Sequence, residues 1–166
     1  MSSKRKIEEA AFFIELLHAL QERSEPLTHL DDVDAEASFL YAAILNAFYS
    51  TVETMTHEGI DTKSFRAKYP EIYAFGSKGG ERAKTVHLGH TEVAPTSYQP
   101  STTLVFRRPA RLVEERELAT PAPRNSLIFK KEFYFYVELA GQNVHALQFC
   151  EEHMGELWAF HVAQST

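Results

Sequence analysis

The fold of this chain is decided by an apolar stretch in its first third, Ala37-Ser38-Phe39-Leu40-Tyr41-Ala42-Ala43-Ile44-Leu45-Asn46-Ala47-Phe48. Large apolar residues recur in it at intervals of three and four, the spacing that places side chains on one face of a helix. The pattern predicts a long helix over Val33–His57. The small alanine side chains of this helix would let a second helix approach it closely. We expect an aspartate at position 31, 32 or 34 to cap its start and Glu58-Gly59 to end it.

The segment before this stretch has the same periodicity. Apolar residues from Ile7 to Leu20 follow helical spacing, and Ser24-Glu25-Pro26 ends the pattern, since proline cannot continue the backbone hydrogen-bond ladder. The connection to the next helix is short, so the two helices are expected to pack as an antiparallel pair over residues 4–57.

Residues 61–90 predict a region of short elements. A helix is expected to start at Asp61 or Thr62, and Pro70 is suited to begin another, because proline fits the first turn of a helix. The segment from Gly76 to Gly80 contains three glycines, and each would destabilise a helix by about 1 kcal/mol, so we expect the helix to be interrupted there.

The last part of the chain combines loop, strand and helix. Residues 91–140 hold five of the seven prolines and predict a proline-rich loop followed by a small β hairpin. The hairpin would pair the aromatic strand at Leu127–Leu139 with a candidate strand at Thr102–Phe106. A final helix is predicted over residues 143–164, with Asn143 as its N-cap. The fold class is therefore mainly α, a helical bundle with a small hairpin before the C-terminal helix.

Length, charge and cysteine content limit the class of protein. The chain has 166 residues, which suits a single domain over residues 1–166, and 44% of them are hydrophobic, as in a folded protein. The net charge of −6 argues against a surface that coats nucleic acid. One cysteine, no signal peptide and no long apolar run predict a cytoplasmic protein without a membrane segment.

One pair of residues has the chemistry of a metal-free ribonuclease. Arg82 and His87 are separated by four residues, in Arg82-Ala83-Lys84-Thr85-Val86-His87. Histidine transfers protons near neutral pH, and arginine stabilises the charge that develops on a phosphate. About one Arg–His pair with four to six intervening residues is expected by chance in this composition. Arg23 and His29 also fall in this range, with five residues between them, but one of these is Pro26, in the connection between the long helices.

The order of these pieces resembles the HEPN family. The likeness includes the Ala37–Phe48 stretch, the aromatic segment Phe65–Phe75, the motif from Arg82 to His87, and a closing strand and helix over Phe133–Phe160. It implies a HEPN-like helical bundle that dimerises, with Arg and His of both protomers meeting in one composite cleft. Family members with the motif are commonly metal-independent endoribonucleases, often toxins or defence effectors.

The resemblance predicts a catalytic pair, Arg82 and His87, and an RNA substrate for a homodimer. Candidate supporting residues are Lys84 and His90 near the motif, and Glu53 and Asn46 on the second helix, which would orient the pair or merely lie at its rim. No cofactor or metal is expected. The alternative function is a non-catalytic binding or regulatory module acting through nucleotides or protein partners, such as a nucleotidyltransferase-type antitoxin.

Two histidine-containing patterns also suggest metal ligands, but weakly. His87-Leu88-Gly89-His90 has no carboxylates at helical spacing, and Glu151-Glu152-His153 is better explained as a solvated helix face. Two further features are expected to be structural. Cys150 is predicted to be a buried, inert thiol, and Trp158 and Phe160 are predicted to belong to the core.

Overall fold

The structure is a computed structural model, and it describes residues 2–74, 80, 94–95, 112–113, 128–129, 134–139 and 141–164. Its helices are α1 (Ser3–Arg23), α2 (Val33–His57), α3 (Lys63–Lys68), α4 (Pro70–Tyr73) and α6 (Ala146–Gln164). Its strands are β1 (Ala94–Pro95), β2 (Leu112–Val113), β3 (Ile128–Phe129), β4 (Phe135–Leu139) and β5 (Gln142–His145). The mainly helical class with a small hairpin before the last helix is confirmed.

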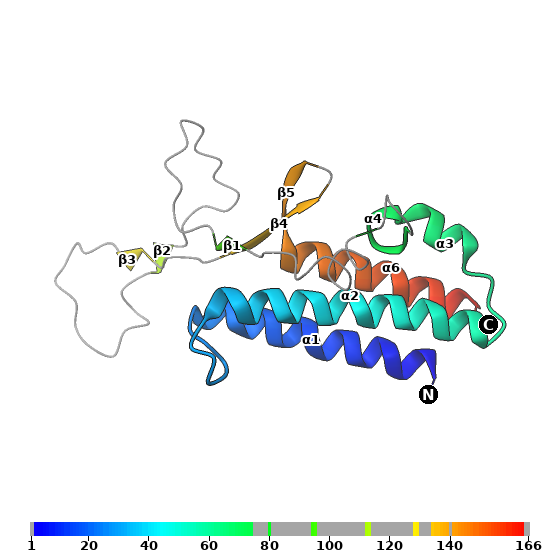
Figure 1. The fold of residues 1–166 in the computed structure, drawn as a ribbon, viewed down its shortest axis with the longest axis horizontal. Helices are drawn as coiled ribbons and strands as arrows, with labels where there is room; N and C mark the ends of the chain where they lie inside the picture. Colours follow the sequence, from blue (N-terminus) through cyan, green and yellow to red (C-terminus); the bar gives the residue numbers. More distant parts are fainter. Residues whose placement is uncertain are drawn as a thin grey trace.

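The long helices α1 and α2 form the predicted antiparallel pair (Figure 1). Helix α1 is followed by the cap residue Ser24, which lies in the left-handed region with a φ of 55° and whose N–H donates to the Leu20 carbonyl. Of the three aspartates proposed as cap of α2, Asp32 takes this role. Its Oδ1 accepts hydrogen bonds from the N–H groups of Asp34 and Ala35, at 3.0 and 2.9 Å.

A buried carboxylate holds the connection between α1 and α2. Glu36 accepts hydrogen bonds from the N–H groups of Leu27 and Thr28, at 2.6 and 2.7 Å, and from the Thr28 hydroxyl. Burial raises the pKa of this carboxyl, but the hydrogen bonds from Thr28 and Leu27 outweigh burial and leave the pKa below its ordinary value. Glu36 therefore acts as the charged acceptor that orders the loop.

Replacing Glu36 with glutamine is expected to lower the free energy of unfolding by about 2 kcal/mol at neutral pH, because an amide offers one acceptor oxygen where the carboxylate offers two. The difference should shrink as the pH falls below the ordinary glutamate value of 4.5. Urea denaturation measures it. Glu25→Gln, in the exposed part of the same loop, is the control, and an equal loss in that variant would contradict the assigned role.

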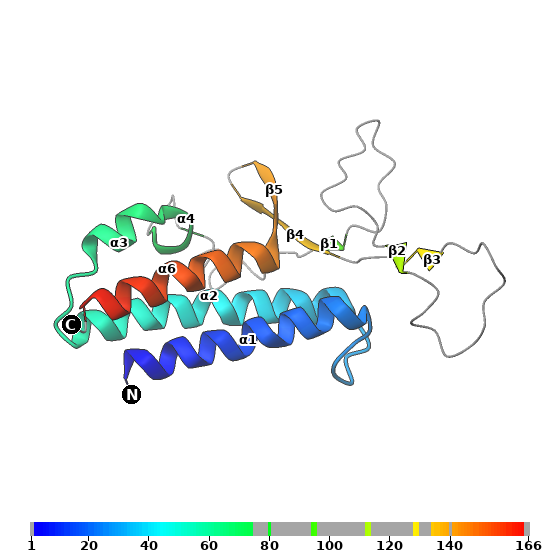
Figure 2. The same cartoon turned by 180° about the vertical axis from the view of Figure 1, so that it is seen from behind.

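Helix α6 packs against both α1 and α2 and completes the helical core (Figures 1 and 2). The C-terminal end of α6 lies beside the start of α1, where His161 Nε2 is 3.1 Å from the Ser3 hydroxyl oxygen. Glu58 accepts a hydrogen bond from the Ser3 N–H at 3.0 Å and so joins the end of α2 to the same corner. The largest fully buried side chains come from these three helices, from the hairpin and from α4, among them Tyr41, Phe48, Phe135, Leu17, Leu157 and Ile72.

Two short helices follow α2, as the proline and polar residues predict. Helix α3 begins after Thr62, and Asp61 Oδ1 accepts the Lys63 N–H at 3.1 Å. Pro70 opens α4, where its missing N–H leaves no helical hydrogen bond unmade. Helix α4 ends at Tyr73.

The hairpin differs from the predicted one in its partner strand. Strand β4 pairs with β5 on one side and with β1 on the other, while β2 and β3 form a separate pair. The expected strand at Thr102–Phe106 lies outside the described residues. The turn between β4 and β5 contains Gly141 with a φ of 77°, a conformation that favours glycine.

The start of the last helix was also predicted wrongly. Asn143 is not a helix cap but a residue of β5, where it faces Glu138 of β4. The cap role is taken by His145, whose Nδ1 accepts the Gln148 N–H at 3.0 Å. The hairpin therefore extends to residue 145, and α6 is three residues shorter than the predicted helix at its start.

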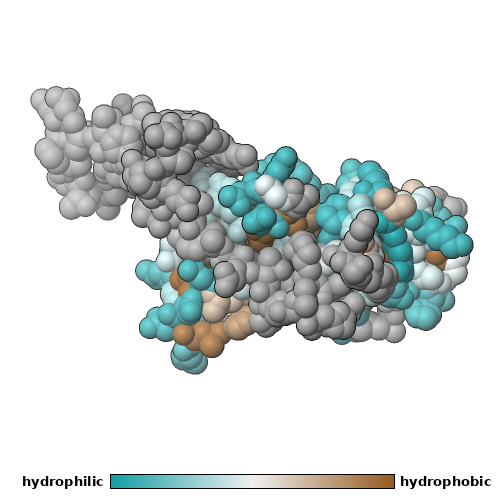
Figure 3. Space-filling model, turned by 45° about the horizontal axis from the view of Figure 1, so that its top comes forward, coloured by the Kyte–Doolittle hydropathy of each residue, from teal (hydrophilic) through white to brown (hydrophobic). Residues whose placement is uncertain are grey.

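Most apolar side chains of the described residues lie inside, with a few exceptions. Trp158 is 45% exposed, so its predicted place in the core is wrong, whereas Phe160 packs against the core. Phe39 is also 43% exposed. The described part of the face in Figure 3 is mostly hydrophilic, with small apolar areas. Within the described ranges, no helix is long and apolar enough to cross a membrane.

Candidate functional site

The residues predicted to carry catalysis lie outside the described part of the chain. These residues are Arg82 and His87, and the candidate supporting residues Lys84 and His90 lie outside it as well, so all four roles remain predictions. The weak metal pattern at residues 87–90 lies outside it as well. Described residues flank the motif only at its start, where Gly80 precedes Arg82 by two positions.

The two supporting residues predicted on α2 are both described. Glu53 forms an ion pair with Arg66 of α3, with Oε1 and Nη2 2.9 Å apart, and the Arg66 guanidinium lies over the Tyr49 ring. Asn46 donates from Nδ2 to the Ala42 carbonyl of its own helix at 3.0 Å. These contacts of the two residues are structural, and the Glu53 ion pair holds α3 against α2.

Gly80 is held tightly against α4. Its N–H donates to the Ala74 carbonyl at 2.8 Å, and the residue is buried. A Cβ atom at this position would lie 2.7 Å from the Glu71 carbonyl oxygen and from the carbonyl carbon and oxygen of Ile72. Only glycine allows such a close approach of two backbone segments. The chain is thus anchored to α4 immediately before the Arg82 motif begins in the sequence.

Replacing Gly80 with alanine is expected to lower the free energy of unfolding by about 2 kcal/mol, because the added methyl group would overlap the backbone of α4. Gly155→Ala is the matched control, since a Cβ at Gly155 meets nothing within 4 Å. It should leave stability unchanged or raise it by up to about 1 kcal/mol, as alanine favours the helix. Thermal and urea unfolding of both variants tests the contrast, and equal stabilities would refute the close approach.

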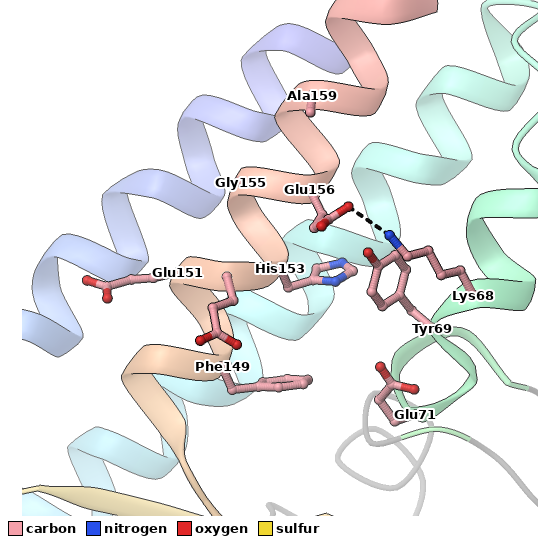
Figure 4. A pocket seen from close by; sticks show the side chains of 10 residues that line it. Lys68, Tyr69, Glu71, Phe149, Glu151, His153, Gly155, Glu156 and Ala159 are labelled. Carbon is pink, nitrogen blue, oxygen red and sulfur yellow. Dashed lines mark hydrogen bonds and ion pairs between the residues drawn. The ribbon is translucent and has the colours of Figure 1, made fainter. Parts of the chain in front are cut away.

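A groove of about 670 Å³ lies between α6 and the segment that carries α3 and α4 (Figure 4). Helix α6 contributes Phe149, Glu151, Glu152, His153, Gly155, Glu156 and Ala159, and the opposite wall contributes Lys68, Tyr69 and Glu71. Glu71 connects the groove to the anchored glycine, because its side chain lines the groove and its carbonyl group touches Gly80. The groove is therefore adjacent to the point where the chain enters the motif.

His153 lies in an aromatic cluster in the wall of this groove. Its Nε2 is 2.8 Å from the Tyr73 hydroxyl, and its ring packs edge-on against Phe48 and Tyr69, each with ring centroids 4.7 Å apart. The residue is only 3% exposed, and desolvation lowers its pKa to about 4. His153 is therefore neutral near neutral pH, and its ring offers one hydrogen-bond donor and one acceptor.

An ion pair bridges the two walls. Lys68 Nζ and Glu156 Oε2 are 2.9 Å apart, and the same ammonium lies 5.0 Å from the Tyr69 ring centroid. Tyr69 and Glu156 together raise the pKa of Lys68 to about 12, and Lys68 lowers the pKa of Glu156. The groove thus already holds one alkylammonium group between a carboxylate and an aromatic face.

The sequence interpretation of Glu151-Glu152-His153 is only partly right. Glu151 and Glu152 are exposed, as a solvated helix face requires, but His153 is buried. The signal for its burial was present: position 153 follows Ala146 and Cys150 at helical spacing on the buried face of α6. Its partner Tyr73 carried no local signal, because it is 80 residues away in the chain.

The described residues give no support for a metal centre. No group of three or more His, Cys, Asp or Glu side chains is arranged to bind a metal ion in the described ranges. Cys150 is fully buried, as predicted, and burial raises the pKa of its thiol above the ordinary value. The groups available for chemistry in the groove are therefore carboxylates, one ammonium group, a neutral imidazole and aromatic rings.

Comparison of the chain with family models, with curated proteins and with solved structures gave no match. The HEPN resemblance therefore rests on the order of sequence features.

Proposed function

We propose that this protein is a metal-independent endoribonuclease of the HEPN class that acts as a homodimer through Arg82 and His87. The observation that carries the proposal is the anchoring of Gly80 on α4, two residues before Arg82. The antiparallel helix pair and the aromatic α3–α4 segment follow one another in the order expected of the family, and Gly80 comes next in the sequence before the motif. The acidic groove beside this entry would repel RNA, so contact with the substrate would involve few phosphates.

The proposed reaction is an internal transfer at phosphorus. His87 removes the proton of a ribose 2′-OH, the 2′-oxygen attacks the adjacent phosphorus, and the bond to the 5′-oxygen breaks. The leaving 5′-oxygen takes a proton from the partner subunit's His87, and Arg82 stabilises the charge on the phosphate oxygens. The products are a 2′,3′-cyclic phosphate and a 5′-hydroxyl, with no metal or redox partner required.

A shared site also suits the spacing of the pair. Two residues five positions apart point about 140° away from each other on a straight helix, as its 3.6-residue period requires. One protomer would therefore have difficulty presenting Arg82 and His87 to the same phosphate from a regular helix. A site across a dimer axis, or at a helix end, removes this difficulty.

The proposal is tested by incubating the purified protein with end-labelled single-stranded RNA in excess EDTA. The expected result is cleavage with 2′,3′-cyclic phosphate ends, from a species that light scattering identifies as a dimer. Cleavage that requires an added divalent metal ion, or products with 3′-hydroxyl ends, would rule out this mechanism. A dimer that leaves RNA intact would favour the alternative role, a binding or regulatory module, for which the groove offers a surface.

A further inference from the structure

We propose that the groove between α6 and the α3–α4 segment is a binding site for an organic cation, a guanidinium or primary amine, held between carboxylates and aromatic rings. This inference goes beyond the proposed ribonuclease function and does not rest on it, because it uses only described residues. It is carried by the charge of the groove, its aromatic walls and a buried imidazole nitrogen.

The charge of the groove favours a cation. Among the described residues that line it, four are glutamates and one is a lysine. Glu156 is paired with Lys68, and Glu152 accepts a hydrogen bond from Gln148 at 2.7 Å. Glu71, on the opposite wall, has no hydrogen bond or ion pair with another described residue. Carboxylates from two separate elements therefore meet at the groove with more negative charge than the single ammonium neutralises.

The aromatic walls add specificity for an organic cation over an inorganic one. Phe149 and His153 project from α6 toward the segment that carries Tyr69 and Glu71 (Figure 4). Aromatic faces attract alkylammonium and guanidinium groups through their negative π surfaces. The molecule itself provides an example, because the Lys68 ammonium lies over the Tyr69 ring while it pairs with Glu156. A ligand cation would use the Phe149 ring and the Glu71 and Glu152 carboxylates in the same manner.

His153 supplies an independent indication of a ligand. The residue is 3% exposed and lines the groove, and its Nδ1 has no hydrogen-bond partner among the described residues. A buried polar atom without a partner is costly, and a water, an ion or a ligand group supplies the missing partner at such positions. When Nε2–H donates to the Tyr73 oxygen, Nδ1 is an acceptor, which an N–H of the ligand would satisfy. The volume of about 670 Å³ suits a ligand of amino-acid size or larger.

The test is binding of agmatine and of acetyl-arginine amide, followed by isothermal calorimetry and by ¹⁵N NMR of the histidine rings. Acetyl-citrulline amide is the matched neutral probe, since it replaces the guanidinium with a urea of the same shape. Both cations are expected to bind at least tenfold more tightly than the neutral probe and to shift His153 toward the Nε2–H tautomer. Tighter binding of agmatine would indicate a free cation, and tighter binding of acetyl-arginine amide a peptide side chain.

Variants distinguish binding by the groove carboxylates from attraction to the negative surface charge in general. Glu71→Gln and Glu152→Gln are expected to weaken binding of the cationic probes at least tenfold, while Glu8→Gln, on the exposed face of α1, should leave it unchanged. Equal binding of the cationic and neutral probes, equal weakening by Glu8→Gln, or no binding at millimolar concentration would overturn the proposal. None of these outcomes depends on RNA cleavage, so this proposal and the ribonuclease proposal can fail separately.

Discussion

Replacing His87 or Arg82 with alanine is expected to lower the rate of RNA cleavage in EDTA at least a hundredfold. The loss for His87 follows from the contribution of general acid–base catalysis, about 10² to 10⁴ in rate. The loss for Arg82 follows from removal of the charge that stabilises the phosphate. Single-turnover cleavage of labelled RNA measures both effects, and circular dichroism with thermal unfolding should show unchanged folding.

The chain contains a matched control for this experiment. Arg23 and His29 have a similar spacing, and both are exposed at the connection between α1 and α2. Arg23→Ala and His29→Ala are expected to retain wild-type cleavage. If they reduce cleavage as much as the motif variants do, or if His87→Ala remains active, the assignment of the catalytic pair is wrong.

The helical part of the fold could be predicted because its signals are local. The periodicity of α1 and α2 and the cap at Asp32 are all contained within a few residues, and the structure confirms them. The boundary at β5 was missed for the opposite reason. Val144 and Leu147 have helical spacing, but Val144 pairs with Val137 across the hairpin. Tertiary pairing overrides local periodicity where a strand runs directly into a helix.

The groove could not be predicted from the sequence, because it depends on contacts between distant elements. Lys68 and Glu156 are separated by 88 residues, and Tyr73 and His153 by 80. No spacing rule connects such pairs, since only the packing of α3 and α4 on α6 brings them together. The sequence did predict the local parts of this arrangement, namely a helix break at Pro70 and a long helix that contains His153.

The free energy of unfolding is expected to fall by about 3 kcal/mol between neutral pH and pH 4, because His153 is buried in a neutral form. Its ordinary pKa of 6.5 applies to the unfolded chain, whereas burial lowers the folded value to about 4. Below pH 6.5 the unfolded chain therefore binds a proton that the folded protein does not, which favours unfolding by up to about 1.4 kcal/mol per pH unit. The loss stops near pH 4, where folded His153 also becomes protonated.

The groups around His153 shift its pKa in opposite directions. Desolvation is the main cause of the lowered pKa, Lys68 lowers it further, and the Glu156 carboxylate raises it. The hydroxyl of Tyr73 and the ring of Tyr69 complete the surroundings, and burial raises the pKa of Tyr73, so its hydroxyl stays uncharged. His153 changes the free energy of unfolding between pH 6.5 and pH 4. Glu36 changes it below pH 4.5, so the two effects fall mostly in different pH ranges.

The decisive variant changes both partners of the buried hydrogen bond. His153→Phe alone would leave the Tyr73 hydroxyl buried without its partner, which costs about 1–3 kcal/mol, whereas His153→Phe with Tyr73→Phe removes both polar groups together. Urea denaturation at pH 7.5 and pH 5.0 should show the wild type losing about 2 kcal/mol and the double variant losing much less. His57→Gln, at an exposed position, should behave as the wild type. The double variant has no imidazole at position 153. If its free energy of unfolding still fell by about 2 kcal/mol between pH 7.5 and pH 5.0, another group would be responsible for the loss.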